Sequence, residues 1–218
     1  MKAVIVAHGE VGPADAGHLA GADLLVAADG GALALEAIAP EARPHLLVGD
    51  LDSLDPETVR RLEAAGTRVE RHAADKEASD TELAVRAAAA AGADEILVLG
   101  AMGGERLDHE LANLLLLADP SWRGRDLSIV HGRTSVRVLH AGESLLLKGA
   151  TGDLVTLLPM SGDAEGVTTT GLRWRLDAET LRMGRSRGLS NEVVRPPASV
   201  QLERGVLLVV ETAAEGAT

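Results

Sequence analysis

The residues of this 218-residue chain that could carry chemistry begin with two aspartates that follow an apolar segment. Residues 46–48 read Leu-Leu-Val, and residues 49–53 read Gly-Asp-Leu-Asp-Ser. If the backbone stays extended, the carboxylates of Asp50 and Asp52 project from one face of a strand at its carboxyl end, where open α/β sheets bind ligands. Two adjacent carboxylates repel each other unless a cation lies between them, and Mg²⁺ with nucleotide phosphates fits that need. The alternative is a loop in which both aspartates cap turns.

A second charged cluster, Asp-Lys-Glu-Ala-Ser-Asp, occupies residues 75–80. Ser79 and Glu82 have the spacing of a capping box, which predicts a helix that begins at Asp80. The helix dipole favours an acid at that position, so a purely structural role explains Asp80. A functional role places Asp80 beside the first two aspartates as a further metal ligand, with Lys76 reaching a phosphate.

A glycine-rich segment at residues 100–109 follows another apolar run and opens a helix. Gly103 and Gly104 allow backbone amides to approach an anion at a helix N-terminus. Asp29 and Gly30, which follow an earlier apolar run, form a weaker version of the same turn. Both segments are therefore candidates for contact with phosphate.

The helix opened by the glycine-rich segment carries polar residues. Arg106 precedes it and is able to hold phosphate oxygens in a bidentate fork. His109 and Asn113 are four residues apart and therefore share one helix face. The apolar stripe of the same helix is expected to face the core; it comprises Leu111, Leu114, Leu115 and Ala118.

The first 130 residues alternate short apolar runs with helical patterns. The expected strands are residues 3–7, 24–27, 46–48, 67–71, 96–99 and 127–130, and the expected helices are residues 31–38, 56–65, 80–91 and 107–118. Continuous apolar runs are typical of strands that are buried on both faces. The pattern therefore predicts an α/β domain, residues 1–131, with a mostly parallel, Rossmann-like sheet covered by helices.

The remaining chain, residues 132–218, has a different pattern of short strand-like segments separated by glycines, which predicts an antiparallel β-sandwich domain. Its expected strands are residues 135–140, 144–148, 154–158, 200–202 and 206–211. Residues 168–176 alternate, with Trp174 on the face of Leu172 and Leu176, which predicts a core strand with a buried tryptophan. Residues 188–192 favour a turn, and residues 213–218 a frayed tail.

The composition excludes several classes of protein. The sequence holds no cysteine, which removes disulfides, thiol catalysis and Cys-ligated zinc. Its 33 acidic and 21 basic residues give a net charge of -12, the opposite of the basic surface expected for a nucleic-acid partner. No apolar run approaches the roughly 20 residues that a membrane helix needs. The first apolar run is too short for a signal peptide, so a cytoplasmic protein with no membrane partner is expected.

Five motifs, taken together, resemble those of the thiamine pyrophosphokinase family. They are GDLDS, DKEASD, GAMGGERLDHELAN, TTTGLRW and GLSNE, and the resemblance extends from Asp29 to Ser190. It implies an enzyme that transfers a pyrophosphoryl group from ATP, its co-substrate, to the hydroxyl of thiamine with the help of Mg²⁺, and that releases AMP. It also implies that the α/β domain binds ATP and metal and that the β domain binds thiamine. The family works as a homodimer in which each site lies between the α/β domain of one subunit and the β domain of the other.

The resemblance also implies roles for individual residues. The metal ligands are Asp50, Asp52 and Asp80, and the catalytic residues are Asp80, Arg106 and Asp108, of which Asp108 orients the thiamine hydroxyl or accepts its proton. The nucleotide-binding residues are Asp29, Gly30, Lys76, Gly103, Gly104, Arg106, His109 and Asn113. The thiamine-binding residues are Trp174, Ser190 and Asn191. The sequence departs from the family pattern at Glu77 and Ser79, where Asp and Thr are usual, and at Leu33, which follows Ala32 where Asn is common. The segment 100–109 also carries one extra residue.

Other functions compete with this one. The first is a diphosphokinase that acts on another alcohol, such as a pterin. The second is a metal-dependent glycosyltransferase that uses the Asp50 and Asp52 pair. The third is a non-catalytic nucleotide sensor, which would tolerate the loss of one acid. Release of AMP that depends on both thiamine and Mg²⁺ distinguishes all of these.

Overall fold

The computed structural model describes residues 1–215, so residues 216–218 of the expected frayed tail lie outside the described chain. The chain forms two compact units. The N-terminal unit holds Met1–Leu116 together with Gly124–Gly132. The C-terminal unit holds Leu117–Arg123 together with the described chain from Arg133 onward.

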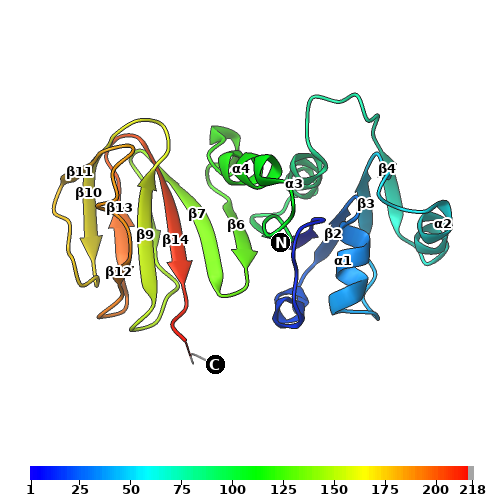
Figure 1. The fold of residues 1–218 in the computed structure, drawn as a ribbon, viewed down its shortest axis with the longest axis horizontal. Coiled ribbons are helices and arrows are strands. Elements are labelled where there is room, and N and C mark those ends of the chain that lie inside the picture. The colour runs from blue at the N-terminus through cyan, green and yellow to red at the C-terminus, as the bar shows by residue number, and fades with distance from the viewer. Residues whose placement is uncertain (216–218) are drawn as a thin grey trace. The chain divides into compact units, whose positions relative to one another are not determined.

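The N-terminal unit is built on a parallel sheet, as the sequence predicts (Figure 1). Its strands are β1 (Lys2–Val6), β2 (Leu24–Ala28), β3 (Leu46–Gly49), β4 (Arg68–Arg71), β5 (Glu95–Leu99) and β6 (Asp126–His131). They lie in the order β6-β5-β1-β2-β3-β4, and neighbouring strands pair in parallel. The carboxyl ends of all these strands therefore meet at one edge of the sheet.

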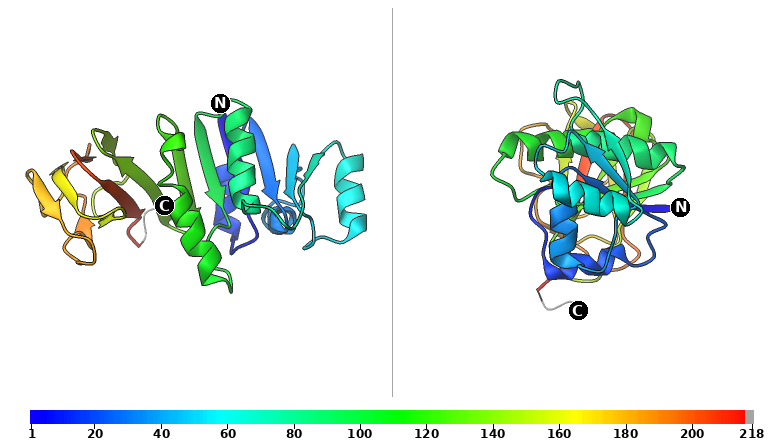
Figure 2. Two further views of the ribbon diagram at one scale, coloured as in Figure 1. Left: turned by 90° about the horizontal axis from the view of Figure 1, so that it is seen from above. Right: turned by 90° about the vertical axis from the view of Figure 1, so that its right-hand side faces the viewer.

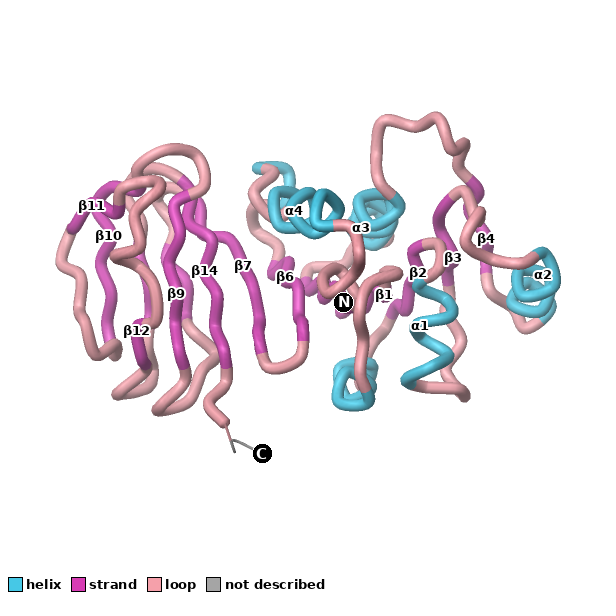
Figure 3. Tube along the Cα trace, in the orientation of Figure 1, coloured by secondary structure: helices cyan, strands magenta, loops and turns pink. Residues whose placement is uncertain are grey.

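Helices cover both faces of this sheet. They are α1 (Gly31–Ile38), α2 (Pro56–Ala64), α3 (Asp80–Ala90), α4 (Leu107–Leu116) and a 3-10 helix, η1 (Pro13–Leu19). Figure 3 shows α1 and η1 on the opposite side of the strands from α3 and α4, and the left view of Figure 2 shows α3 and α4 in front of the strands. On the α1 face, Val4, Val6 and Leu25 pack against Leu35. Burial on both faces explains the continuous apolar strands.

Local signals define where two of these helices begin. The Asp55 side chain accepts hydrogen bonds from the amides of Glu57 and Thr58 at the start of α2, and the Ser79 hydroxyl accepts one from the amide of Glu82 at the start of α3. These caps satisfy backbone donors that a helix leaves unpaired. The predicted N-terminus of α3 at Asp80 is therefore confirmed.

The orientation of α4 differs from the prediction. Leu111 and Leu115 belong to the stripe expected in the core, but their exposed fractions are 51% and 61%, and that of Leu107 is 66%. The buried residue of the helix is Asn113, whose Nδ2 donates a hydrogen bond to the carbonyl of Ala101 at 2.8 Å. The polar face is thus held toward the glycine-rich loop, and the leucine face is turned outward within the described chain.

The C-terminal unit contains antiparallel sheets around one apolar core. Their strands are β7 (Thr134–His140), β8 (Ser144–Leu146), β9 (Leu154–Pro159), β10 (Ala164–Thr170), β11 (Glu179–Leu181), β12 (Asn191–Glu192), β13 (Ser199–Gln201) and β14 (Val206–Thr212), and a short 3-10 helix, η2 (Pro120–Trp122), also belongs to this unit. One set of paired strands has the order β12-β9-β14-β7, and a separate four-stranded sheet has the order β11-β10-β13-β8. Leu157 and Leu207 from the first share a core with Val167 and Val200 from the second.

The predicted core strand over residues 168–176 is wrong in its second half. Strand β10 ends at Thr170, and the chain turns at Gly171, where φ is +73° and an added Cβ would lie 2.5 Å from the carbonyl oxygen of Arg195. Leu172 and Leu176 are buried as expected, but Trp174 is 59% exposed. The turn breaks the alternation that would have buried the tryptophan.

The expected turn at residues 188–192 is present up to Ser190, and a short strand follows it. Asn191 and Glu192 form β12, which pairs with β9. Ser190, directly before it, has a φ of +56°, so the turn itself is completed there. Within the residues that the structure describes, no helix has both the length and the apolar character needed to cross a membrane.

Candidate functional site

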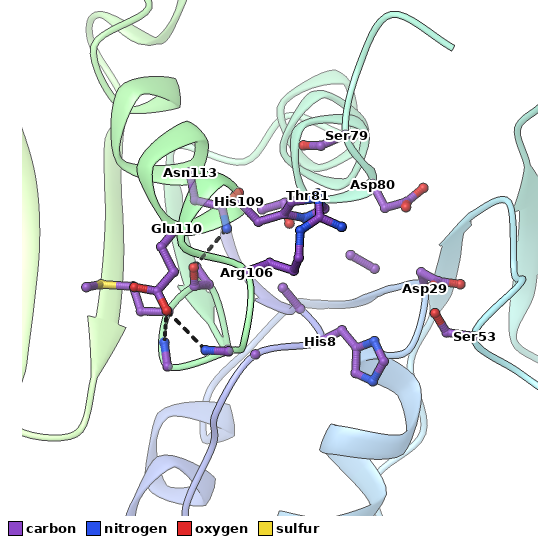
Figure 4. Close-up of a pocket in the computed structure, with 18 of the residues that line it drawn as sticks. His8, Asp29, Ser53, Ser79, Asp80, Thr81, Arg106, His109, Glu110 and Asn113 are labelled. Atoms are coloured by element: carbon purple, nitrogen blue, oxygen red, sulfur yellow. Dashed lines mark hydrogen bonds between the residues drawn. The ribbon is translucent and has the colours of Figure 1, made fainter. Parts of the chain in front are cut away.

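A cavity of about 990 Å³ opens at the carboxyl edge of the parallel sheet (Figure 4). Its lining comes entirely from the N-terminal unit, from the segments that follow β1, β2, β3 and β5 and from the first residues of α3 and α4. Ligands bind at this edge in open α/β sheets. The sheet therefore brings together segments that are far apart in the sequence.

Three carboxylates converge on this cavity. One oxygen from each of Asp29, Asp50 and Asp80 lies within 4.8 Å of the others. Asp29 follows β2, Asp50 follows β3, and Asp80 is the first residue of α3. Gly49 permits this approach, since an added Cβ would lie 3.0 Å from Asp80 Oδ1 and 3.1 Å from Asp29 Cβ.

Asp52 lies apart from this group. The expected extended backbone is wrong, because Leu51 has a φ of +65° and turns its side chain into the core. Asp50 consequently faces the carboxylates of Asp29 and Asp80, while Asp52 is exposed and lines the same cavity. The Ser53 hydroxyl donates a hydrogen bond to Asp52 Oδ1 at 3.3 Å. The role of Asp52 as a metal ligand stays a prediction.

Lys76 supplies the positive charge at the three carboxylates. Its Nζ lies 2.8 Å from Asp50 Oδ2 and 2.9 Å from Asp80 Oδ1, and its side chain is 15% exposed. The hydrogen bond from Lys76 is the main cause that lowers the pKa of Asp50 below its usual 3.8. Burial alone would lower the pKa of Lys76, but its hydrogen bonds to Asp50 and Asp80 outweigh that effect and raise it. The single ammonium of Lys76 thus lies in contact with two of the three carboxylates.

The same carboxylates fit a divalent cation. Mg²⁺ prefers oxygen ligands and is commonly held by one or two carboxylates together with substrate phosphates. Oδ1 of Asp29 is buried and accepts no hydrogen bond from the residues described. A buried carboxylate oxygen without a donor is costly unless a cation or water satisfies it. These residues therefore suit the cation that the sequence predicts at this edge.

The glycine-rich segment after β5 forms a loop along the cavity. Its backbone is anchored by the segment after β1, since the amide of Gly9 donates to the carbonyl of Gly100 at 2.6 Å and that of Glu10 to Met102 at 2.8 Å. The loop turns at Gly103, where φ is +77°. Such a turn directs successive amides toward one point, which is how backbone concavities bind anions.

The amides of Gly103 and Gly104 both donate to one oxygen of Glu110, at 2.9 and 3.1 Å (Figure 4). Glu110 lies in the first turn of α4 and is half-buried. Gly103 and Gly104 are predicted from the sequence to contact phosphate, whereas the contact of Glu110 with them is not. The sequence signal for Glu110 is weak, because an acidic residue in the first turn of a helix is already explained by the helix dipole.

Arg106 and Asp108 form a bidentate ion pair beside the loop. The Arg106 Nε and Nη2 lie 2.9 and 2.6 Å from the two oxygens of Asp108. This contact lowers the pKa of Asp108 to about 2 and raises the pKa of Arg106. Both side chains are exposed to solvent. His109 and Asn113 line the cavity, and their role in nucleotide binding stays a prediction.

The C-terminal unit brings the predicted thiamine-binding residues together. The Trp174 amide donates to Asn191 Oδ1 at 3.0 Å, and Asn191 Nδ2 donates to the Trp174 carbonyl at 2.7 Å. Ser190 is adjacent, and its amide donates to Thr156 Oγ1 at 3.0 Å. The guanidinium carbon of Arg173 lies 5.9 Å from the centroid of the Trp174 ring. Reciprocal hydrogen bonds thus fix the backbone beneath an exposed tryptophan.

Comparison with known proteins agrees with both units. The family model described as thiamin pyrophosphokinase, catalytic domain, matches residues 17–130, and the model for the vitamin B1 binding domain matches residues 144–207. The chain belongs to the thiamin pyrophosphokinase family. It is an enzyme by that membership, and its relatives' names describe a diphosphokinase.

Individual members of the thiamin pyrophosphokinase family show how similar the chain is. It is 26% identical over 164 residues to thiamine pyrophosphokinase of Bacillus subtilis, a match that covers 75% of this chain and 76% of the relative. It is 32% identical to thiamine pyrophosphokinase 1 of rice, covering 69% of this chain but 60% of that longer relative. The crystal structure of thiamin pyrophosphokinase from Geobacillus thermodenitrificans superposes with a TM-score of 0.81 at 26% identity and covers 100% of both chains.

The structure gives Asp29 a different place from the one that the sequence suggests, and it adds His8 to the site. Asp29 is in the three-carboxylate group, whereas the sequence suggested only contact with nucleotide. Its signal was available, because Asp29 directly follows the strand adjacent to the one that Asp50 follows. His8, which also lines the cavity, was missed. Its ring lies against Gly30, where an added Cβ would be 2.4 Å from Nδ1, so Gly30 provides space for the histidine.

Proposed function

We propose that this member of the thiamin pyrophosphokinase family transfers the pyrophosphoryl group of ATP to the hydroxyl of thiamine. The thiamine hydroxyl oxygen forms a bond to the β-phosphorus, and the bond from that phosphorus to the α,β-bridging oxygen breaks. AMP leaves with the electron pair of that bond, and the hydroxyl proton passes to solvent. The observation that carries the proposal is the convergence of three carboxylates and a glycine loop on one cavity, in a chain that matches both family models.

The two parts of the chain divide the substrates between them in this proposal. Residues 1–131 bind ATP and metal, and the β-sandwich in the part of the chain from residue 132 onward binds thiamine. The cavity of about 990 Å³ supports the first assignment, because it is at the upper end of the size range of small-molecule sites. The exposed ring of Trp174 supports the second, because a cation such as the thiazolium of thiamine is attracted to an aromatic face.

Asp29, Asp50 and Asp80 would hold Mg²⁺, with Asp52 as a further ligand at the cavity wall. When bound, the ion neutralises charge on the phosphates during transfer. Lys76 then becomes available to the phosphates, since its carboxylate partners are shared with the metal. Arg106 lies at the loop with a planar guanidinium that suits phosphate oxygens. Phosphoryl transfer relies on this kind of positioning and charge neutralisation more than on covalent catalysis.

Asp108 orients the thiamine hydroxyl in this proposal. Its pKa of about 2 makes it a weak proton acceptor at neutral pH, because efficient general bases have pKa values near the working pH. An ionised carboxylate nevertheless accepts a strong hydrogen bond from a hydroxyl. As long as Asp108 is paired with Arg106, it is therefore suited to orient the thiamine hydroxyl and not to remove its proton.

A homodimer, with sites shared between subunits, is also part of the proposal. The outward leucines of α4, spaced four residues apart, form an apolar stripe that a second copy would cover. Leu111→Asp is expected to dissociate the dimer and to reduce activity with it, as measured by light scattering and turnover. Leu33→Asp, at an exposed leucine of α1, serves as the control. A fully active monomer would contradict this part. The cytoplasmic location stays a prediction.

Steady-state AMP release tests the proposed activity. Release that requires both thiamine and Mg²⁺ is the expected result. Release with a pterin alcohol in place of thiamine would point to a different diphosphokinase, which the match to a vitamin B1 binding domain disfavours. Binding of ATP without any thiamine-dependent release would indicate a nucleotide sensor and overturn the proposal.

A further inference from the structure

The glycine loop of the proposed nucleotide site is already occupied by a carboxylate of the same chain. One oxygen of Glu110 accepts hydrogen bonds from the amides of Gly103 and Gly104, at 2.9 and 3.1 Å. Figure 4 shows this side chain directed back from α4 onto the loop. Two adjacent amides that share one anionic oxygen are the arrangement in which backbone loops hold a phosphate oxygen.

Other contacts fix the loop, so Glu110 is not needed to shape it. The amides of Gly9 and Glu10 donate to the carbonyls of Gly100 and Met102. An added Cβ at Gly103 would lie 2.5 Å from the side chain of Glu10, which shows how closely the two segments pack. Removal of the Glu110 carboxylate would therefore leave the two amides in place and without a partner.

We propose that Glu110 is an internal stand-in for phosphate, which occupies the Gly103 and Gly104 amides in the free enzyme and leaves them when a nucleotide phosphate binds. The inference rests on the proposed function, because it assumes that a polyphosphate enters this cavity. The incoming phosphate must replace one charge-assisted interaction with another of the same kind, which lowers its apparent affinity. After transfer the carboxylate returns to the amides and favours departure of the phosphate-bearing product.

Variants of two glutamates separate this contact from a general effect of charge. Glu110→Gln keeps the size of the side chain but removes its charge, and Glu110→Asp keeps the charge but shortens the reach to the amides. Glu105→Gln removes the same charge from the same loop, and the Glu105 side chain makes no hydrogen bond to either amide. The probes are inorganic pyrophosphate and α,β-methylene ATP with Mg²⁺, measured by titration calorimetry.

Glu110→Gln is expected to bind both probes about fivefold more tightly than the wild type, since a charged acceptor holds an amide more strongly than a neutral one. Glu110→Asp is also expected to bind more tightly, and Glu105→Gln to change by less than about twofold, as exposed charges do. Equal gains from Glu110→Gln and Glu105→Gln, with Glu110→Asp like the wild type, would show a general charge effect and overturn the proposal. So would unchanged or weaker binding by Glu110→Gln.

The amide resonances of Gly103 and Gly104 give a direct second readout by NMR. Both are expected to shift on substitution of Glu110 and to shift again when pyrophosphate is added. Resonances that pyrophosphate leaves unmoved would overturn the proposal even if affinity changes. If the wild type binds nucleotide and releases AMP with thiamine, and Glu110→Gln has the same affinity for the probes as the wild type, only the role of Glu110 is refuted. A wild type that binds no nucleotide would refute the proposed function as well.

Discussion

Lys76 places its ammonium 2.8 Å from the Asp50 carboxylate, at the group of acids that also suits a divalent cation. A lysine and a metal ion compete for the same oxygens, so the ligand-free protein carries its own cation. Acids that converge without a cation repel each other. The pairing therefore stabilises the ligand-free fold and sets a cost for metal binding.

Lys76→Gln should consequently have two opposite effects. The free energy of unfolding in EDTA is expected to fall by about 1–3 kcal/mol. This loss is larger than that for an exposed ion pair and smaller than that for a fully buried one. The affinity for Mn²⁺ in the absence of nucleotide is expected to rise, as measured by electron paramagnetic resonance. Arg71→Gln, at an exposed arginine outside the cavity lining, is the control for loss of charge. Weaker Mn²⁺ binding by Lys76→Gln would contradict competition.

Asp29→Asn tests whether the acid that sequence analysis assigned to nucleotide belongs to the metal site. Loss of one carboxylate ligand is expected to weaken Mn²⁺ binding at least tenfold, on the order of 1.4 kcal/mol or more, and to abolish metal-dependent turnover. Asp52→Asn is expected to lose turnover too, with its fold intact by circular dichroism. Asp75→Asn, at an exposed acid of the neighbouring segment, should behave like the wild type. Near-full activity of Asp29→Asn would exclude it from the site.

Trp174→Ala tests the tryptophan as a platform for thiamine. Because the ring is exposed, the variant should lack the roughly 3–5 kcal/mol loss of stability typical of a buried tryptophan. Its KM for thiamine is expected to rise about 5- to 150-fold. This rise corresponds to the loss of about 1–3 kcal/mol of binding free energy from stacking and cation–π attraction. In Trp122→Phe, thiamine should change the emission of the remaining Trp174. Turnover of thiamine without any change in that emission would refute the platform.

The pH dependence of Asp108 follows from its pairing with Arg106. A pKa of about 2 in the folded state lies below the ordinary 3.8, so the unfolded chain binds the proton more readily. The pair therefore contributes stability above pH about 4 that is lost as the pH falls toward 2. Carbon-13 NMR of the Asp108 carboxyl should show a midpoint near the low value in the wild type and an ordinary one in Arg106→Gln. Equal midpoints would contradict the pairing.

Much of the fold could be predicted because its signals are local or periodic. The inner parallel strands are apolar on both faces, and the caps at Asp55 and Ser79 define helix starts through residues next to them. Trp174 was misplaced because alternation does not reveal the turn at Gly171. The leucine face of α4 was misplaced because Asn113 is held by a loop that precedes the helix, a contact that periodicity does not contain.

The site was predictable to the extent that each segment carries its own motif. Asp50, Asp80 and Arg106 stand in such motifs, and the order of strands in the sheet brings the first two together. The turn at Leu51 could not be foreseen, since a leucine rarely adopts a positive φ. Glu110 could not be foreseen either, because its contact depends on how the loop folds back over the first turn of α4.

Product analysis by phosphorus-31 NMR tests the proposed transfer most directly. ATP, thiamine and Mg²⁺ incubated with the wild type are expected to give thiamine diphosphate and AMP in equal amounts and without ADP, because the β- and γ-phosphates move as one group. Asp50→Asn should give neither product. Accumulation of ADP, or of AMP in the absence of thiamine, would contradict pyrophosphoryl transfer by this site.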